Sequence, residues 1–357
     1  MSAPATLPAC LVRHARERPN DVALRKKDLG RWREWTWAEY EQQVARVAAG
    51  LRDRGIERGD RIAIQAENRP EWLIADIAAQ AIGAIVVGVY PTSPAAELAY
   101  LMRHSGAKLL IAEDEEQADK ALAVRSDLSE LSELFVIDAR GVRSDAVRHW
   151  DELDRAEPVD LAACAAQLDP EDTAIIVYTS GTTGPPKGAM LSHANMLYAA
   201  RIFRGAYDSS PDDEVLSYLP LCHIAERLFS VLGALEAGYV VNFGAGGESF
   251  ATDMREVQPT LFLGVPRVWE KMLASIEVRM ADASRLKRLA WRVALARGGL
   301  IGHVLAFRTL REKLGLVRVR AAISGAAPIA PQVLEFFARI GVQVREGYGQ
   351  TEGTAVA

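Results

Sequence analysis

The sequence YTSGTTGPPKG, residues 178–188, combines glycines and prolines with hydroxyl side chains and one lysine. The residues TAIIVYTS (173–180) that lead into it form an apolar, β-branched run of strand length. The residues MLSHANMLYAARIF (190–203) follow with apolar side chains at helical spacing, and Ser192 can cap that helix. We therefore expect a glycine-rich loop between a buried strand and a helix, where α/β proteins commonly bind anions.

The loop has the chemistry of a polyphosphate site. Backbone amides beside glycine can approach phosphate oxygens, hydroxyl groups can donate hydrogen bonds, and a lysine supplies positive charge. A P-loop requires Gly-Lys-Ser/Thr, whereas Gly188 follows Lys187, and the GxGxxG dinucleotide fingerprint is also absent. A plain surface loop is the alternative, but the density of donors favours phosphate binding. The candidate phosphate-binding residues are Thr179, Ser180, Gly181, Thr182, Thr183, Gly184 and Lys187.

Strand-like and helix-like segments alternate along the rest of the chain. Thr36 and Glu39 form a capping box before a helix that Gly55 can end. Apolar runs then recur between helical segments, which predicts an α/β fold with mostly parallel sheets. The expected strands lie in IVVGVYP (85–91), KLLIAED (108–114), LFVIDA (134–139), EVLSYLP (214–220), YVVNFG (239–244), PTLFLGVP (259–266), VRAAISG (319–325) and VQVREGYG (342–349).

Composition and charge exclude several classes of function. The 357 residues carry a net charge of −5 without a basic stripe, so we expect no nucleic-acid partner. Three separated cysteines lack metal-ligand spacing, and no signal peptide or membrane-spanning run is expected, which indicates a cytoplasmic protein. The helical, basic and amphipathic stretch 270–316 is expected to be a solvated surface. Peripheral contact with an anionic membrane is the alternative.

A second pair of motifs lies near the end of the chain. SGAAP (324–328) and EGYGQTEG (346–353) each follow a strand-like run. Small residues at two strand ends leave a flat slot in which a planar base can lie against backbone and an aromatic ring. Thr351 can donate to a phosphate oxygen, and Glu352 is a suitable ligand for Mg²⁺.

With these motifs together and in this order, the sequence resembles the adenylate-forming superfamily, which includes acyl-CoA synthetases, luciferases and peptide-synthetase adenylation domains. The resemblance implies a fold class: the large N-terminal domain of that superfamily, with two interleaved, doubly wound α/β sub-regions. It also implies a nucleotide site between them. The residues implied to bind nucleotide, besides the phosphate loop, are Ser324, Gly325, Ala326, Ala327, Pro328, Glu346, Gly347, Tyr348, Gly349 and Thr351.

Three further segments resemble the long-chain fatty acyl-CoA synthetases: NRPEW (68–72), LPLCHIAER (219–227) and PTLFLGVPRVWEKM (259–272). This branch implies a reaction in which a fatty acid attacks ATP, pyrophosphate leaves, and the acyl group passes from AMP to coenzyme A. The implied catalytic residues are Thr351, Glu352, Lys187 and His223, with Glu352 holding Mg²⁺ and His223 able to gate the acyl tunnel. A helix-start histidine satisfied by backbone groups is the alternative for His223. Glu226 and Arg227 are read as a local pair or as functional residues, and Trp269 as a tunnel or a core residue.

The resemblance extends over an N-terminal portion of that fold. The sequence ends five residues after Glu352, so the family's C-terminal lid domain, with its adenylation lysine, is expected to be missing. Residues 1–357 alone are then expected to be poorly active, and uncovered surface could pair two copies as a homodimer. The expected sub-regions are 56–204, and 1–55 together with 205–357.

The residues 219–272 predict a long apolar acyl tunnel, in which Gly233 or Gly264 would leave room for alkyl carbons. Packing of the second sheet by these residues is the alternative. Two other functions stay open: an adenylation module that loads a carrier protein or a reductase, and a nucleotide-binding relative without catalysis.

Overall fold

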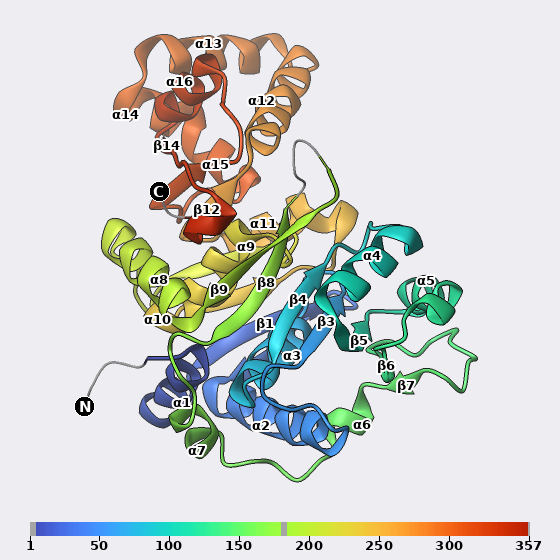
Figure 1. Ribbon diagram of the computed structural model, residues 1–357. Helices are drawn as coiled ribbons and strands as arrows, with labels where there is room; N and C mark the ends of the chain where they lie inside the picture. The colour runs from blue at the N-terminus through green and yellow to red at the C-terminus, as the bar shows by residue number, and fades with distance from the viewer. Residues whose placement is uncertain (1–4, 180–183, 356–357) are drawn as a thin grey trace.

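The computed structural model describes residues 5–179 and 184–355 (Figure 1). Its strands form sheets of seven, four and three strands. The α/β class expected from the alternation of strands and helices is confirmed. The strands are β1 (Val22–Asp28), β2 (Arg31–Thr36), β3 (Arg61–Gln65), β4 (Ile85–Val89), β5 (Ala107–Ala112), β6 (Glu133–Val136), β7 (Arg148–His149), β8 (Thr173–Thr179), β9 (Lys187–Ser192), β10 (Glu214–Ser217), β11 (Val240–Phe243), β12 (Leu261–Gly264), β13 (Ala321–Ser324) and β14 (Val344–Glu346).

Helices connect these strands, and short helical turns lie beside several of them. The longer helices are α1 (Leu7–Glu17), α2 (Trp37–Asp53), α3 (Pro70–Ala81), α4 (Ala95–Ser105), α5 (Glu115–Ala123), α8 (His193–Tyr207), α11 (Phe250–Val257), α12 (Pro266–Ala281), α13 (Arg285–Arg297), α15 (Arg308–Leu314) and α16 (Pro331–Arg339). The short ones are α6 (Asp151–Asp154), α7 (Leu161–Ala166), α9 (Ile224–Arg227), α10 (Gly233–Ala237), α14 (Gly299–Gly302), η1 (Arg125–Asp127), η2 (Leu228–Leu232), η3 (Gly247–Ser249), η4 (His303–Phe307) and η5 (Thr351–Gly353).

The seven-stranded sheet has the order β7-β6-β5-β3-β4-β8-β9 and is parallel except for the last pair. Side chains alternate between its two faces. Ile62 and Ile64 of β3 pack into the core that holds α3, while Ala63 between them packs into the core under α4 and α5. Both faces are therefore covered by helices, which is why these strands read as continuous apolar runs rather than as alternating ones.

The glycine-rich loop connects two antiparallel strands, which corrects the expectation that it leads directly into a helix. Thr179 pairs with Lys187, and Tyr178 pairs with Gly188, so β8 and β9 form a hairpin. Helix α8 begins only at His193, next to the opposite end of β8, with Ser192 as its N-cap and a capping box to Asn195. The amino end of α8 therefore cannot contribute its dipole to a phosphate at the loop. The apolar β-branched residues of β8 predicted one strand, but the returning strand KGAMLS carries too weak a pattern to be recognised.

The four-stranded sheet joins parts of the chain that are far apart in sequence. β1 and β2 form an antiparallel hairpin, and β1 pairs in parallel with β11, so that Leu24 lies opposite Val241. β10 then pairs with the other edge of β11. The hairpin was not recognised in the sequence because its residues 22–36 are rich in charge, which its exposed positions tolerate.

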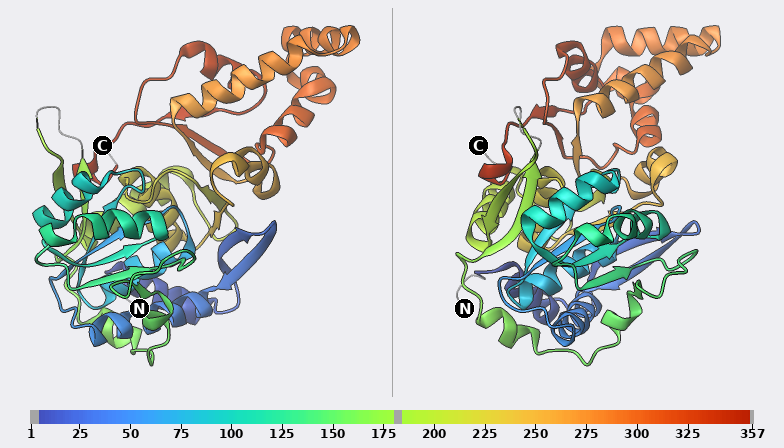
Figure 2. Two further views of the ribbon diagram at one scale, coloured as in Figure 1. Left: turned by 90° about the vertical axis from the view of Figure 1, so that its right-hand side faces the viewer. Right: turned by 45° about the vertical axis from the view of Figure 1, so that its right-hand side comes forward.

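The three-stranded sheet consists of parallel strands β12, β13 and β14. It meets β10 at one edge, where the amide of Thr260 donates to the carbonyl oxygen of Glu214 at 2.9 Å. Figure 2 shows that α12 to α16, in orange and red, project from this sheet away from the two larger sheets. The grouping of the sheets into the sub-regions 56–204, and 1–55 with 205–357, stays a proposal.

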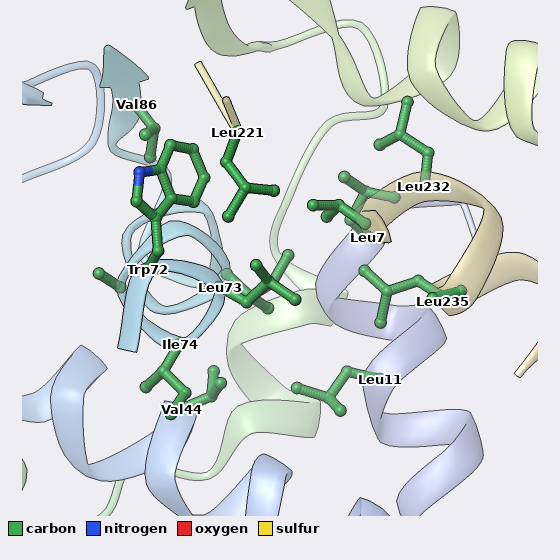
Figure 3. Close-up of a cluster of buried hydrophobic side chains, with 14 of the residues drawn as sticks. Leu7, Leu11, Val44, Trp72, Leu73, Ile74, Val86, Leu221, Leu232 and Leu235 are labelled. Atoms are coloured by element: carbon green, nitrogen blue, oxygen red, sulfur yellow. The ribbon is translucent and has the colours of Figure 1, made fainter. Parts of the chain in front are cut away.

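Helices α1, α2 and α3 share one hydrophobic core with η2 and α10. Figure 3 shows the side chains of this core, with Trp72 of α3 pointing toward Leu221 and Val86. Each buried side chain of this kind stabilises the fold by about 1.5–3 kcal/mol. The core joins the N-terminal helices to the segment after β10, and so fixes the position of residues 219–227.

Candidate functional site

A cavity of about 830 Å³ lies where β8, α8, the loop after β10 and the ends of β12, β13 and β14 meet. Its volume falls in the range of sites for small-molecule ligands. The residues that line it are Tyr90, Thr179, Ile202, Phe203, Ala206, Tyr207, Leu219, Pro220, His223, Ile224, Ala225, Leu228, Phe229, Leu263, Val265, Ile323, Gly325, Ala326, Glu346, Gly347, Tyr348, Gly349, Gln350, Thr351, Glu352 and Ala355.

The two small-residue motifs meet at one edge of the three-stranded sheet. Ser324 and Glu346 are partners at the ends of the parallel strands β13 and β14. The amide of Gly347 donates to the carbonyl oxygen of Ser324 at 2.7 Å. A Cβ added to Gly325 would lie 3.1 Å from the carbonyl oxygen of Gly347, so a side chain there would crowd the slot between the two chains. The close approach of the motifs therefore favours glycine at this position.

The residues of SGAAP take different places. Gly325 and Ala326 line the cavity, and Ala326 has a positive φ of 71°, which is uncommon for a residue with a side chain. Ser324 is buried and is not among the lining residues, and among the described residues its hydroxyl has no hydrogen-bond partner. Ala327 and Pro328 are exposed and are not among the lining residues. The motif as a whole therefore follows the cavity edge, with two of its five residues facing the cavity.

The residues Glu346, Gly347, Tyr348, Gly349, Thr351 and Glu352 all line the cavity. Tyr348 is 72% exposed, and its hydroxyl accepts a hydrogen bond from Nε2 of Gln350 at 2.8 Å. Thr351 and Glu352 begin the turn η5, which contacts β9. The structure thus brings this motif next to the β8–β9 hairpin, although about 160 residues separate the two in sequence.

The predicted phosphate loop is described in part. Thr179 lines the cavity, and its hydroxyl donates to the carbonyl oxygen of Lys187 at 3.5 Å. Lys187 and Gly184 are exposed and do not line the cavity. The predicted donors Ser180, Gly181, Thr182 and Thr183 lie outside the described residues.

His223 lines the cavity and also caps α9, where its Nδ1 accepts a hydrogen bond from the amide of Ala225 at 3.1 Å. Burial lowers the pKa of the imidazole, so the neutral ring predominates near pH 7. The alternative interpretation of His223, a helix-start histidine bonded to a backbone group, is therefore confirmed. Its place in the wall of the cavity is what supports a gating role.

Gly233, Gly264 and Trp269 belong to packed regions rather than to the cavity. A Cβ at Gly233 would lie 2.2 Å from the hydroxyl of Tyr239, and one at Gly264 would lie 2.6 Å from Nε1 of Trp269. Trp269 is fully buried against Phe262 and Phe337. The room at these glycines is filled by aromatic rings, so neither widens the cavity.

Comparison with known sequences identifies the family. The sequence matches the family described as AMP-binding enzyme over residues 11–357. The chain belongs to the AMP-binding enzyme family.

The chain is also similar to named members of this family. It is 32% identical to the long-chain-fatty-acid–CoA ligase ACSBG2 of Xenopus laevis, over 93% of this chain and 49% of that protein. It is 31% identical to the long-chain-fatty-acid–CoA ligase FadD15 of Mycobacterium bovis, over 96% of this chain and 60% of that protein. The chain therefore spans about half to three fifths of the curated relatives it matches. Its fold matches the N-terminal domain of FACL13 from Mycobacterium tuberculosis, with a TM-score of 0.75, 20% identity, and coverage of 98% of this chain and 77% of that chain.

Two carboxylates, those of Glu346 and Glu352, line the cavity, and Glu352 is the predicted cation ligand. Glu352 is exposed at the cavity edge, and the part of the chain that the structure describes contains no group of three or more His, Cys, Asp or Glu residues arranged to hold a metal ion. Mg²⁺ commonly binds through one or two carboxylates together with substrate phosphates and water. Glu352 fits that mode and does not provide a closed protein cage.

For Glu226 and Arg227 the sequence left open a local pair or a functional role, and the structure does not pair the two with each other. Arg227 binds Asp76 of α3, and Glu226 binds hydroxyl groups of Ser217 and Ser230. Their partners lie on other elements, and no pattern in the sequence points to them.

Proposed function

We propose that the full-length protein is an AMP-forming ligase that activates long-chain fatty acids and transfers the acyl group to coenzyme A. The observation that carries the proposal is the mixed lining of the cavity. Its polar residues include Thr179, Tyr348, Thr351 and Glu352. Its apolar residues include Ile202, Phe203, Leu228, Phe229, Leu263, Val265 and Ile323. Such a site suits an intermediate with a nucleotide at one end and an alkyl chain at the other.

In the first half-reaction a carboxylate oxygen of the acid attacks the α-phosphorus of ATP, and the bond to the β-phosphate oxygen breaks. Pyrophosphate leaves with that electron pair. The acid is already ionised near pH 7, so no side chain has to act as a general base. Stabilisation of charge on the phosphates is then the main requirement. Thr351 and the hairpin donors would bind phosphate oxygens, and Lys187 would approach the distal phosphates. Bound Mg²⁺, held by Glu352, would supply further positive charge to those oxygens.

In the second half-reaction the sulfur of coenzyme A attacks the acyl carbon and AMP leaves. The apolar wall would exclude water from the acyl-adenylate, which water would otherwise hydrolyse. His223, as a neutral ring in this wall, would separate the nucleotide end from the acyl end. Each buried methylene of the chain would contribute about 0.8 kcal/mol.

Exchange of labelled pyrophosphate into ATP by the full-length protein tests the proposal. Exchange that depends on a long-chain acid, followed by formation of acyl-CoA, is the expected result. Release of ADP and orthophosphate would contradict adenylation. Transfer to a carrier-protein thiol in place of coenzyme A would indicate an adenylation module. Nucleotide binding without any exchange would indicate a relative without catalysis.

Contact with an anionic membrane is a second part of the proposal, and α12 and α13 are its candidate surface. Within the described residues, none of the helices is both long and apolar enough to cross a bilayer. Leu286 and Leu289 are 77% and 53% exposed, beside the exposed cations Arg285, Lys287 and Arg288. Sedimentation with phosphatidylglycerol vesicles, but not with phosphatidylcholine vesicles, is expected and should weaken in a Leu286→Ser, Leu289→Ser variant.

Pairing of two copies stays a prediction that analytical ultracentrifugation can test.

A further inference from the structure

The cavity wall between β10 and α9 has little regular secondary structure of its own. We name residues 219–223 the wall segment; Leu219, Pro220 and His223 of this segment line the cavity. An irregular segment beside a cavity needs partners for its backbone groups from elsewhere in the protein. Two side chains, Asn68 and Glu226, supply them.

Asn68 lies in the loop between β3 and α3, about 150 residues before the wall segment. Its Nδ2 donates to the carbonyl oxygen of Leu219 at 2.7 Å and to the hydroxyl of Ser217 at 2.8 Å. Its Oδ1 accepts from the amide of Leu221 at 3.2 Å. Both polar atoms of this side chain are therefore committed to the wall segment and to the strand end before it.

Glu226 holds the same segment from its other side. Glu226 is buried, with 2% of its surface exposed. Its carboxylate accepts hydrogen bonds from the hydroxyl of Ser217 at 2.7 Å and from the amide of Leu219 at 3.3 Å. It also accepts from the hydroxyl of Ser230 in η2. Asn68 and Glu226 thus share Ser217 and Leu219 as partners, one acting from the loop between β3 and α3 and the other from α9.

A separate contact fixes α9 against α3. Both guanidinium Nη atoms of Arg227 donate to the carboxylate of Asp76 at 2.8 Å, and both residues are fully buried. Because Glu226 is the neighbour of Arg227, its carboxylate is presented from a fixed helix. The wall segment is consequently held between two rigid elements rather than by its own packing alone.

We propose that Asn68 and Glu226 are positioning residues of the ligase reaction, which hold the wall segment in the shape that aligns the fatty acid with the nucleotide. This inference rests on the proposed function, and it assigns a role to two residues that do not line the cavity. A small displacement of such a wall can reduce the rate of a reaction by about a hundredfold, because the reacting atoms lose their alignment.

The test uses the full-length enzyme with Asn68→Ala, Glu226→Gln and the double variant. The matched control is Asp213→Asn. Like Glu226, Asp213 has a buried carboxylate that accepts a hydrogen bond from a hydroxyl, here that of Thr260. Unlike Glu226, it lies at the end of β10 that is remote from the wall segment. Both single variants should lower kcat/KM for palmitate by about tenfold or more. They should also change the ratio of kcat/KM for palmitate to that for octanoate. A loss of folded enzyme alone leaves this ratio unchanged.

The double variant should lose less than the product of the single losses, because both side chains hold the same two residues. Hydrogen exchange at the amides of Leu219 and Leu221 should accelerate in each variant and stay unchanged in Asp213→Asn. Kinetic losses no larger than those of the control, or a constant chain-length ratio, would overturn the inference while leaving the ligase proposal intact. If the wild-type enzyme shows no exchange of pyrophosphate, the proposed function fails. Unchanged amide exchange in the variants would then also refute the holding role of Asn68 and Glu226.

Discussion

Replacement of Arg227 by methionine should destabilise the protein strongly, because it leaves Asp76 without its cation in a fully buried site. Asp76 is 0% exposed and would retain a single described donor, Nε2 of Gln80 at 3.0 Å. Burial already raises the pKa of Asp76, although Arg227 and Gln80 lower it. The guanidinium carbon of Arg227 lies 4.7 Å from the centre of the Trp72 ring. Methionine is long and flexible enough to cover this ring in its place, so the substitution removes the charge and keeps most of the packing. Removal of one partner from a buried pair costs about 3–5 kcal/mol.

Urea-induced unfolding, followed by intrinsic tryptophan fluorescence, measures this loss as a lower midpoint at constant slope. The double variant Asp76→Leu, Arg227→Met should recover most of it, since well-packed apolar side chains can replace a buried ion pair at little cost. The loss should also persist at high salt, because buried charges are poorly screened. The buried ion pair of Asp76 with Arg227 would be refuted if Arg227→Met lowers the free energy of unfolding by less than about 1 kcal/mol. A double variant less stable than the single one would also refute it.

Three further predictions concern the site and its surroundings. Lys187→Ala should weaken binding of ATP more than that of AMP, because the lysine is expected at the distal phosphates; equal losses by calorimetry would contradict that placement. Burial raises the pKa of Glu226 to about 7, so the folded protein binds this proton more tightly than the unfolded chain, and stability should fall by about 3 kcal/mol as pH rises from 4.5 to 7. Denaturation of Glu226→Gln across this range should lack that decline, and an identical decline would assign it to other groups. Gly264→Leu should displace Trp269 and destabilise the protein by about 1–3 kcal/mol without changing chain-length preference, whereas a shift toward shorter acids would place Gly264 at the acyl chain.

Local structure was predictable wherever the controlling interactions lie within a few residues. The capping box of Thr36 with Glu39 and the cap at Ser192 depend on side chains within three positions of the helix start, and the apolar runs of β4 and β8 follow from burial on both faces. The meeting of the motifs SGAAP and EGYGQTEG could also be predicted, because the carboxyl ends of neighbouring parallel strands lie at one edge of a sheet. The β1–β2 hairpin escaped recognition since its strands are charged and partly exposed.

The sequence by itself determined the alternation of most strands and helices, the glycine-rich turn, and the residue types available for phosphate and metal binding. Only the tertiary structure decided that the turn belongs to a hairpin, with η5 beside it, and that α8 begins at the wrong end of β8 to assist it. It also decided the partners of Asn68 and Arg227, which lie about 150 residues away in sequence. The physical reason is that a buried charge or amide must find a partner, but the identity of that partner depends on which surfaces the whole chain brings together.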